Sequence, residues 1–239
     1  YRKMRKNYAV IAAGGLGTRL KNFKDNLHTK VLIDIDGMSM ISTQINQLKS
    51  WGFLDFIVIT NPDFHDLIVD DIKQNHRNLN ISFVVQDQPK GIAHALSFAE
   101  SKVDDDSLVT FILGDNFFGE NPLEGIDFKN FKGSQIFAIN VNNPDEFGVM
   151  ELDRDNNLIN IHEKPKEFIS SLAVVGVYIY EKTCFEFINQ LNPSARGELE
   201  ITDLNKLYLT NNLLNYSIIN SWWIDAGTEE RIKKLKKLI

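Results

Sequence analysis

The sequence is poor in the features that build disulfide frameworks and membrane spans. Cys184 is the only cysteine among 239 residues, so no disulfide can form within the chain. Neither a secretory signal nor a run of about 18 apolar residues is present. We therefore expect a cytoplasmic protein without a membrane partner.

Positive charge is scarce as well. The formal net charge is −6, and the concentrated lysines lie in residues 231–238, Arg-Ile-Lys-Lys-Leu-Lys-Lys-Leu. Binding to nucleic acid usually requires a basic surface, so we expect no nucleic-acid partner. The lysine-rich segment is predicted to be a helix with one solvated face, although contact with an acidic partner stays open.

Repeats and low-complexity linkers are absent too. With 43% hydrophobic and 24% charged residues, the composition is that of a globular protein, and we predict a single domain over residues 1–239. Because the chain begins at Tyr1 and not at methionine, an upstream partner domain stays open, and so does a homo-oligomer.

The first half of the chain alternates between strand and helix patterns. Residues 7–13 form a continuous apolar run before two glycines, which is typical of a strand buried on both faces of a parallel sheet. This alternation predicts a parallel sheet with helices on both faces. Helices are expected at 40–51, 63–76 and 91–101, and further strands at 53–60, 81–86 and 107–113.

The rhythm changes after about residue 133. Short connections between apolar runs predict antiparallel strands beside the parallel ones, and three helices complete the chain. The expected strands are 134–141, 148–153, 158–162, 173–180 and 214–220, and the helices are 181–191, 200–209 and 228–239.

A glycine-rich loop, Gly14-Gly15-Leu16-Gly17-Thr18-Arg19, follows the first strand. Successive backbone N–H groups without Cβ atoms can wrap a polyphosphate. A dinucleotide fingerprint fails because Leu20 stands where the third glycine is needed, and a P-loop fails because Thr18-Arg19 follows Gly17. Arg19 and Lys30 could neutralise phosphate oxygens, and the alternative is a tight turn with a surface arginine.

Several motifs recur in an order that resembles one family. They are Ala13-Gly-Gly-Leu-Gly-Thr-Arg-Leu20, Gln86 five places before Gly91, Leu113-Gly-Asp-Asn116, Phe147-Gly-Val149, Glu163-Lys-Pro165, Arg196-Gly-Glu-Leu-Glu-Ile-Thr-Asp203 and Trp223-Ile-Asp-Ala-Gly-Thr228. Over almost the whole chain this order resembles the sugar-1-phosphate nucleotidyltransferases, and within them the glucose-1-phosphate thymidylyltransferases.

The resemblance implies both a fold and a reaction. The fold would be an α/β, Rossmann-like, mostly parallel mixed sheet flanked by helices, with a nucleotide-binding part at about 7–132 and an antiparallel, sugar-phosphate-binding part at about 133–228. The substrates would be a nucleoside triphosphate, dTTP or UTP, and a hexose 1-phosphate, with Mg²⁺ as cofactor and pyrophosphate as product. Residues 196–203 favour dTTP. Such a reaction needs cations and positioning, and no nucleophilic side chain.

The family match also implies a role for each matched position. The nucleotide would contact Ala13, Gly14, Gly15, Gly17, Thr18, Gln86, Gly91 and Asp115. Catalysis would depend on Arg19, Lys30 and Lys164, the sugar phosphate would contact Gly148, Glu163, Lys164 and Val174, and Mg²⁺ would bind Asp115 and Asp225. An amide such as Gln86 offers the donor and acceptor that thymine or uracil requires.

Each matched side chain also has a plain structural alternative. Asp115 could be a helix cap, Asp225 a turn residue and Gln86 a polar strand end. Lys164 could be an exposed lysine, and Glu163 could form a surface ion pair with Lys164 or Lys166.

Two positions depart from the family pattern. Lys30 lies one residue further from Arg19 than usual, without flanking prolines, and Phe147 replaces a tyrosine near the sugar. Two other functions stay open: a nucleotide-sugar sensor without turnover, and an oxidoreductase, which Leu20 disfavours.

Other reactive residues are given no role. The five histidines lack metal-binding spacing, and Cys184 is expected to be a buried thiol in a helix. Trp222 and Trp223 are expected to pack the end of a strand.

Overall fold

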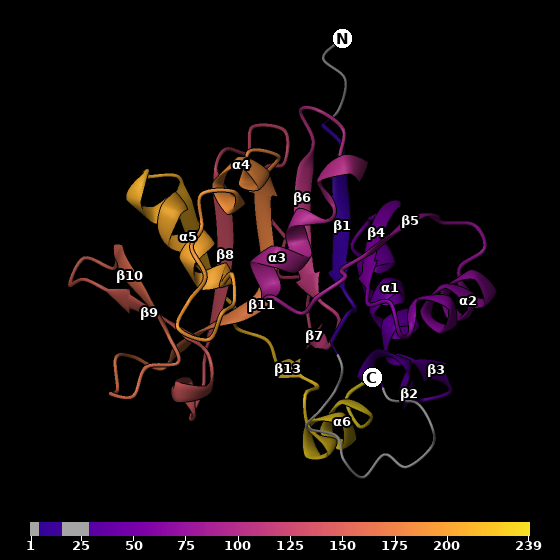
Figure 1. Ribbon diagram of the computed structural model, residues 1–239. Coiled ribbons are helices and arrows are strands. Elements are labelled where there is room, and N and C mark those ends of the chain that lie inside the picture. The colour runs from indigo at the N-terminus through magenta and orange to yellow at the C-terminus, as the bar shows by residue number, and fades with distance from the viewer. Residues whose placement is uncertain (1–4, 16–28) are drawn as a thin grey trace.

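The computed structural model describes residues 5–15 and 29–239. Its central feature is a mixed sheet that contains nine strands within those residues (Figure 1). The strands are Asn7–Ala12 (β1), Asp55–Thr60 (β4), Asn80–Val85 (β5), Leu108–Leu113 (β6), Ser134–Asn140 (β8), Gly148–Leu152 (β9), Leu158–Glu163 (β10), Leu172–Glu181 (β11) and Leu214–Ile218 (β12). Their order is β10-β9-β11-β6-β1-β4-β5, with β8 beside β11 and β12 beside β8.

The sheet has a parallel half and a mainly antiparallel half, as predicted. β1 runs parallel to β4 and β6, and β4 runs parallel to β5. β11 runs antiparallel to β6, β8 and β9, and β10 runs antiparallel to β9. The exception is β12, which is parallel to β8. Because β11 pairs with both β6 and β8, the sheet continues from one half into the other.

Helices cover both faces of the sheet. They are Met40–Ser50 (α1), His65–Asn75 (α2), Ile92–Ser97 (α3), Cys184–Ile188 (α4), Ile201–Thr210 (α5) and Glu229–Leu235 (α6). Along β1, Tyr8 and Val10 pack into the core beneath α3, α4 and α5, whereas Ala9 and Ile11 pack into the core beneath α1 and α2. This alternation explains why β1 is apolar at successive positions.

A third apolar layer closes the edge where β1 and β6 end (Figure 1). It contains α6 and two small antiparallel pairs, Asn116–Phe118 (β7) with Trp223–Asp225 (β13), and Asp34–Ile35 (β2) with Met38–Ser39 (β3). Phe117, Ile224 and Ile232 are buried in this layer. Thr228 is the N-cap of α6, and its hydroxyl accepts a hydrogen bond from the Arg231 backbone N–H at 3.3 Å.

Some predicted helices are too long. The helix expected at 181–191 is five residues, because β11 continues to Glu181. The helix expected at 91–101 ends at Ser97 and gives way to a 3₁₀ turn at Glu100–Lys102. Cys184 is buried as expected, and this burial raises the pKa of its thiol. In the described ranges, no helix is long and apolar enough to cross a membrane.

Two glycines with positive φ provide a test of the packing between β8 and the turn before β12. A Cβ built on Gly133 (φ +75°) would lie 2.1 Å from the Leu213 carbonyl oxygen, whereas one on Gly125 (φ +82°) would meet nothing within 4 Å. Gly125→Ala should lower the free energy of unfolding by about 1 kcal/mol through backbone strain alone. Gly133→Ala should lower it by about 1–3 kcal/mol more, because the methyl group also overlaps backbone. Urea unfolding midpoints measure both, and equal midpoints would contradict the close approach.

Candidate active site

One cavity of about 470 Å³ lies at the ends of β1 and β6 and extends over β9, β10 and β11. The carboxyl ends of parallel strands are where open α/β sheets bind ligands. The cavity brings together most of the predicted site residues: Gly14, Gly15, Lys30, Gln86, Gly91, Asp115, Gly148, Glu163, Lys164, Val174 and Asp225. Segments far apart in the sequence therefore contribute to one hollow.

Four predicted site residues are not among the described residues that line the cavity. Ala13 is fully buried, and its backbone N–H donates to the Ile59 carbonyl oxygen at 2.8 Å, so neither its N–H nor its methyl group faces the cavity. Gly17, Thr18 and Arg19 lie outside the described residues. Their roles stay predictions.

Two contacts define the glycine end of the cavity, one a hydrogen bond and the other a close approach between backbone segments. The Gly14 carbonyl oxygen accepts a hydrogen bond from Asn61 Nδ2 at 3.0 Å. A Cβ built on Gly91 (φ +105°) would lie 2.4 Å from the Leu199 carbonyl oxygen, so only glycine fits at this point. Leu199, in the motif at 196–203, therefore packs directly against Gly91 at the glycine end of the cavity.

Two carboxylates meet beside one pair of short strands. Asp115 follows β6, Asp225 ends β13, and β7 and β13 pair with Asn116 opposite Asp225. The Ala226 backbone N–H donates to the Asp115 carbonyl oxygen at 2.7 Å. Asp115 therefore does not cap a helix and Asp225 does not lie in a turn, which excludes both structural alternatives.

The pKa values of the two carboxyl groups are shifted in opposite directions. Burial alone would raise the pKa of Asp115, but contact with the Lys30 ammonium and a hydrogen bond from Asn116 lower that pKa below its ordinary value. Burial, and then the nearby Asp115 charge, raise the pKa of Asp225 to about 6. The arrangement concentrates negative charge beside one lysine, as a site for a cation would.

Asn116 connects this pair to the rest of the sheet. Its Nδ2 donates to Asp115 Oδ1 at 2.9 Å, and its Oδ1 accepts from the Gly176 N–H at 3.0 Å and from Trp223 Nε1 at 2.8 Å. Trp223 therefore packs a strand end, as expected. The sequence places Asn116 in a motif but does not reveal these contacts, because its partners come from three separate segments.

Arg231 is a site residue that the sequence did not predict. Its guanidinium donates to Asp225 Oδ2 at 3.4 Å and to Glu146 Oε2 at 2.7 Å, and lies 5.8 Å from the centre of the Phe147 ring. The lysines of this segment lie on a solvated face, as predicted, but its first residue contacts the cavity wall. The cause is β13, which fixes the start of α6 beside Asp225.

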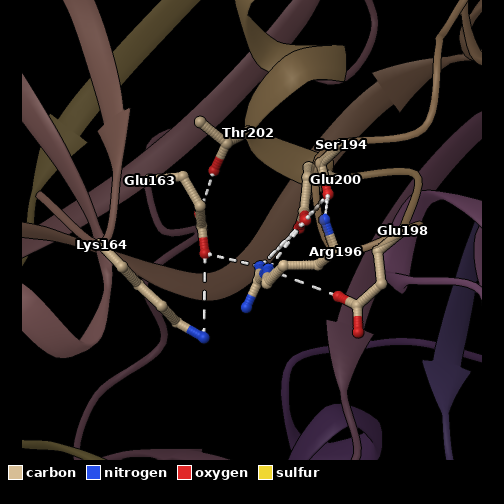
Figure 2. Close-up of polar contacts among 7 residues, drawn as sticks. All are labelled: Glu163, Lys164, Ser194, Arg196, Glu198, Glu200 and Thr202. Carbon is tan, nitrogen blue, oxygen red and sulfur yellow. Dashed lines mark hydrogen bonds and ion pairs between the residues drawn. The ribbon is translucent and has the colours of Figure 1, made fainter.

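A second polar cluster lies at the end of the cavity beside β10 and is drawn in Figure 2. Glu163 Oε2 accepts from the Thr202 hydroxyl at 2.6 Å, while Glu163 Oε1 lies 3.4 Å from Arg196 and 4.0 Å from Lys164 Nζ. The expected pair of Glu163 and Lys164 is therefore present, but as part of a larger network. Lys164 has a positive φ of 45°, and its backbone N–H donates to the Phe147 carbonyl oxygen at 2.9 Å.

Arg196 holds this cluster together. Its guanidinium contacts both carboxylate oxygens of Glu200 at 2.9 Å and approaches Glu198 at 3.7 Å (Figure 2). The Ser194 hydroxyl donates to Glu200 Oε1 at 2.7 Å. Glu163 is therefore held by donors on two sides, so its orientation is set before any ligand arrives.

Comparison with known proteins agrees with this geometry. The nucleotidyl transferase family model matches residues 8–238. A glucose-1-phosphate thymidylyltransferase from Neisseria meningitidis is 35% identical over 96% of this chain and 81% of its own length. One from Mycobacterium tuberculosis H37Rv is 36% identical over 92% of this chain and 77% of its own length. The chain therefore belongs to the nucleotidyl transferase family.

Solved structures share the fold. A Bacillus anthracis protein described as a glucose-1-phosphate thymidylyltransferase, in complex with sucrose, superposes with a TM-score of 0.87 at 34% identity, covering 97% of this chain and 94% of that one. A UDP-glucose pyrophosphorylase in complex with UDP-glucose superposes with a TM-score of 0.80 at 19% identity, covering 98% of both chains. The second likeness concerns the fold alone.

The raised pKa of Asp225 has a measurable consequence for stability. Because the folded environment opposes ionisation, the cost of ionising Asp225 is absent below its unfolded pKa near 4 and fully present above about pH 6. Asp225→Asn removes this cost, so at pH 7.5 in the presence of a chelator it should raise the free energy of unfolding by about 1–3 kcal/mol. The gain should vanish near pH 4. Urea unfolding at both pH values measures it, and an equal gain at both would contradict the assignment.

Proposed function

We propose that this protein transfers a nucleoside monophosphate from a nucleoside triphosphate to a sugar 1-phosphate and releases pyrophosphate. The observation that carries the proposal is that one cavity is lined both by the glycine end of β1, with Lys30 and the paired carboxylates, and by Lys164 and Glu163 at the end of β10. Two phosphate-bearing substrates need cationic contacts at two places within one hollow. The relatives named as thymidylyltransferases support the same reaction.

Different residues of this chain would bind the two substrates. Lys30, and Arg19 as predicted from the sequence, would neutralise the triphosphate, while Lys164 would hold the phosphate of the sugar. Holding the two in line for direct displacement can lower the barrier by about 7–11 kcal/mol. Cys184 is buried in the core and so cannot act as a nucleophile in the cavity, and we infer that the site works by positioning and charge without a covalent intermediate.

The sugar itself would lie against Gly148, Val174 and Glu163. A Cβ built on Gly148 would lie 3.2 Å from the Thr202 hydroxyl and 3.6 Å from Glu163 Oε2, so a side chain there would fill the space beside Glu163. Glu163 would accept hydroxyl groups of the hexose. Phe147 contributes a ring edge-on to Trp223 but no hydroxyl. We favour glucose 1-phosphate as the acceptor, on the basis of the named relatives.

The carboxylate pair fits a hard divalent cation, which we propose to be Mg²⁺. Among the described residues, no three or more histidine, cysteine, aspartate or glutamate side chains converge, so the protein would offer Asp115 and Asp225 alone. Mg²⁺ is commonly bound by one or two carboxylates together with substrate phosphates and water. The chemistry that this ion supplies is neutralisation of the phosphate oxygens, and Lys30 and Asn116 hold Asp115 in its ionised form.

A panel of triphosphates and sugar 1-phosphates tests the reaction. Incubated with Mg²⁺, the protein should release pyrophosphate with dTTP and glucose 1-phosphate, and at a lower rate with UTP. Pyrophosphate release measures each pair. Release from no pair would overturn the proposal, and tight nucleotide-sugar binding without release would identify a sensor.

Substitutions of Asp115 and Lys164 test the site. Asp115→Asn and Lys164→Ala should each lower kcat by at least about 100-fold, because each removes a charge beside a reacting phosphate. Both proteins should keep the wild-type circular dichroism spectrum. Lys166→Ala is the matched control, since Lys166 is an exposed lysine on the same loop that does not line the cavity. A wild-type rate in either site variant, or an equal loss in the control, would show the site to be elsewhere.

A further inference from the structure

Gln86 lies directly after β5, and its side chain lines the nucleotide side of the cavity with only 8% exposure. The two ends of its amide have nearly the same shape but opposite chemistry, because Nε2 carries two hydrogens and Oε1 only accepts. The end that faces the cavity therefore decides which edge of a nucleobase the side chain can bind.

Two hydrogen-bond acceptors lie beside one end of this amide. The Gly91 carbonyl oxygen is 3.4 Å from Gln86 Nε2, and His94 Nδ1 is 3.0 Å from the same nitrogen. A carbonyl oxygen can only accept, so the end that faces Gly91 is the NH₂ group. His94 Nδ1 then also accepts, which requires a neutral imidazole with its proton on Nε2.

The other end of the amide faces the glycine strand end. Gln86 Oε1 lies 3.4 Å from a Cβ built on Gly14. Since Gly91 and His94 engage both amide hydrogens, the side chain presents an acceptor alone to a ligand beside Gly14. This differs from the expectation that Gln86 offers a donor and an acceptor together.

His94 lies behind Gln86 and does not line the cavity. It belongs to α3, and its ring packs edge-on against Phe98 with the ring centres 5.0 Å apart. The imidazole is therefore held by packing on one side and by the Gln86 amide on the other. Its influence on a ligand would act through Gln86.

We propose that His94 is the main positioning residue for the Gln86 amide, with the more distant Gly91 carbonyl oxygen assisting it. By fixing the amide oxygen toward the base, His94 selects thymine or uracil over cytosine. Thymine and uracil carry an N–H at ring position 3, which can donate to Gln86 Oε1, whereas cytosine has an unprotonated acceptor nitrogen there. The inference rests on the proposed function and deepens it by naming the group that sets base specificity.

The test compares two triphosphates that differ only in the edge facing Gln86. dTTP and 5-methyl-dCTP share the deoxyribose, the phosphates and the 5-methyl group, but they differ at ring positions 3 and 4. His94→Lys replaces an acceptor by a donor, which should turn the amide and present its NH₂ group to the base. His94→Glu keeps an acceptor at the same place.

The preference is the ratio of kcat/KM for the two triphosphates. The wild-type protein should prefer dTTP by at least about 100-fold, because cytosine leaves two acceptors facing each other. His94→Lys should reduce this preference by at least about tenfold, with a gain for 5-methyl-dCTP as well as a loss for dTTP. His94→Glu should keep the preference to within about threefold of wild type, since its carboxylate can only accept.

His65→Lys is the matched control for added charge. His65 lies on α2, where its Nδ1 contacts the Thr60 hydroxyl at 2.8 Å and not Gln86. The same new ammonium there should leave the preference unchanged. If His94→Lys fails to fold by circular dichroism, His94→Phe removes the acceptor but keeps a ring against Phe98, and it should lower the preference by at least about threefold.

The outcomes separate this inference from the proposed function. Pyrophosphate release by the wild-type protein with dTTP tests the reaction, and the change of preference in the variants tests His94. Should the wild type bind without turnover, the ratio of the two dissociation constants by calorimetry decides the inference. A wild-type preference kept in both His94→Lys and His94→Phe, an equal loss in His94→Glu, or a wild type that binds both triphosphates alike would overturn it.

Discussion

The repulsion between a buried and a half-buried carboxylate is the constraint on which the candidate site depends. Asp115 lies in the turn before β7 and Asp225 ends β13, which pairs with β7, and burial strengthens the unfavourable interaction between their charges. The Lys30 ammonium contacts Asp115, and the Arg231 guanidinium contacts Asp225. Ionised Asp225 opposes folding, and its presence is understood through what the site binds, since an apolar residue would pack there without the penalty.

In the cluster around Glu163, a carboxylate is held in one orientation and still lines the cavity, where a ligand can reach it. Thr202 donates to one oxygen of Glu163, and Arg196 lies beside the other. Arg196 is itself fixed by Glu200, which is buried. The ordering of these side chains occurs during folding, so a ligand bound there loses less free energy to rearrangement of the protein.

Much of the fold could be predicted because its signals are long or strongly apolar. Continuous apolar runs indicated β1, β4 and β6, and the strand ending before Asp115 placed that carboxylate correctly at the carboxyl edge. β7 and β13 could not be predicted, because three residues carry no periodicity. Their pairing, which brings Asp115 and Asp225 together, is visible only in three dimensions.

The site residues that the sequence missed share one property. Arg231 looks like the start of a solvated helix, and His94 is a single histidine without a motif, so neither carries a local signal. Their contacts appear only in three dimensions: Arg231 contacts Glu146, far away in the sequence, and His94 contacts the Gln86 amide at the preceding strand end. Ala13 is the reverse case, since it belongs to the loop motif but packs into the core.

The strand β11 determines how the two ends of the cavity can move. It pairs with β6 of the parallel half and with β8 and β9 of the antiparallel half, and its register with β8 shifts between Val174 and Tyr178. Within that interval Gly176 donates its N–H to Asn116, beside the carboxylate pair. Two halves that share a hydrogen-bonded strand cannot swing apart about a flexible linker. The two ends of the cavity are thus joined through one strand, and a change in the spacing of β11 would reach Asp115 through Gly176 and Asn116.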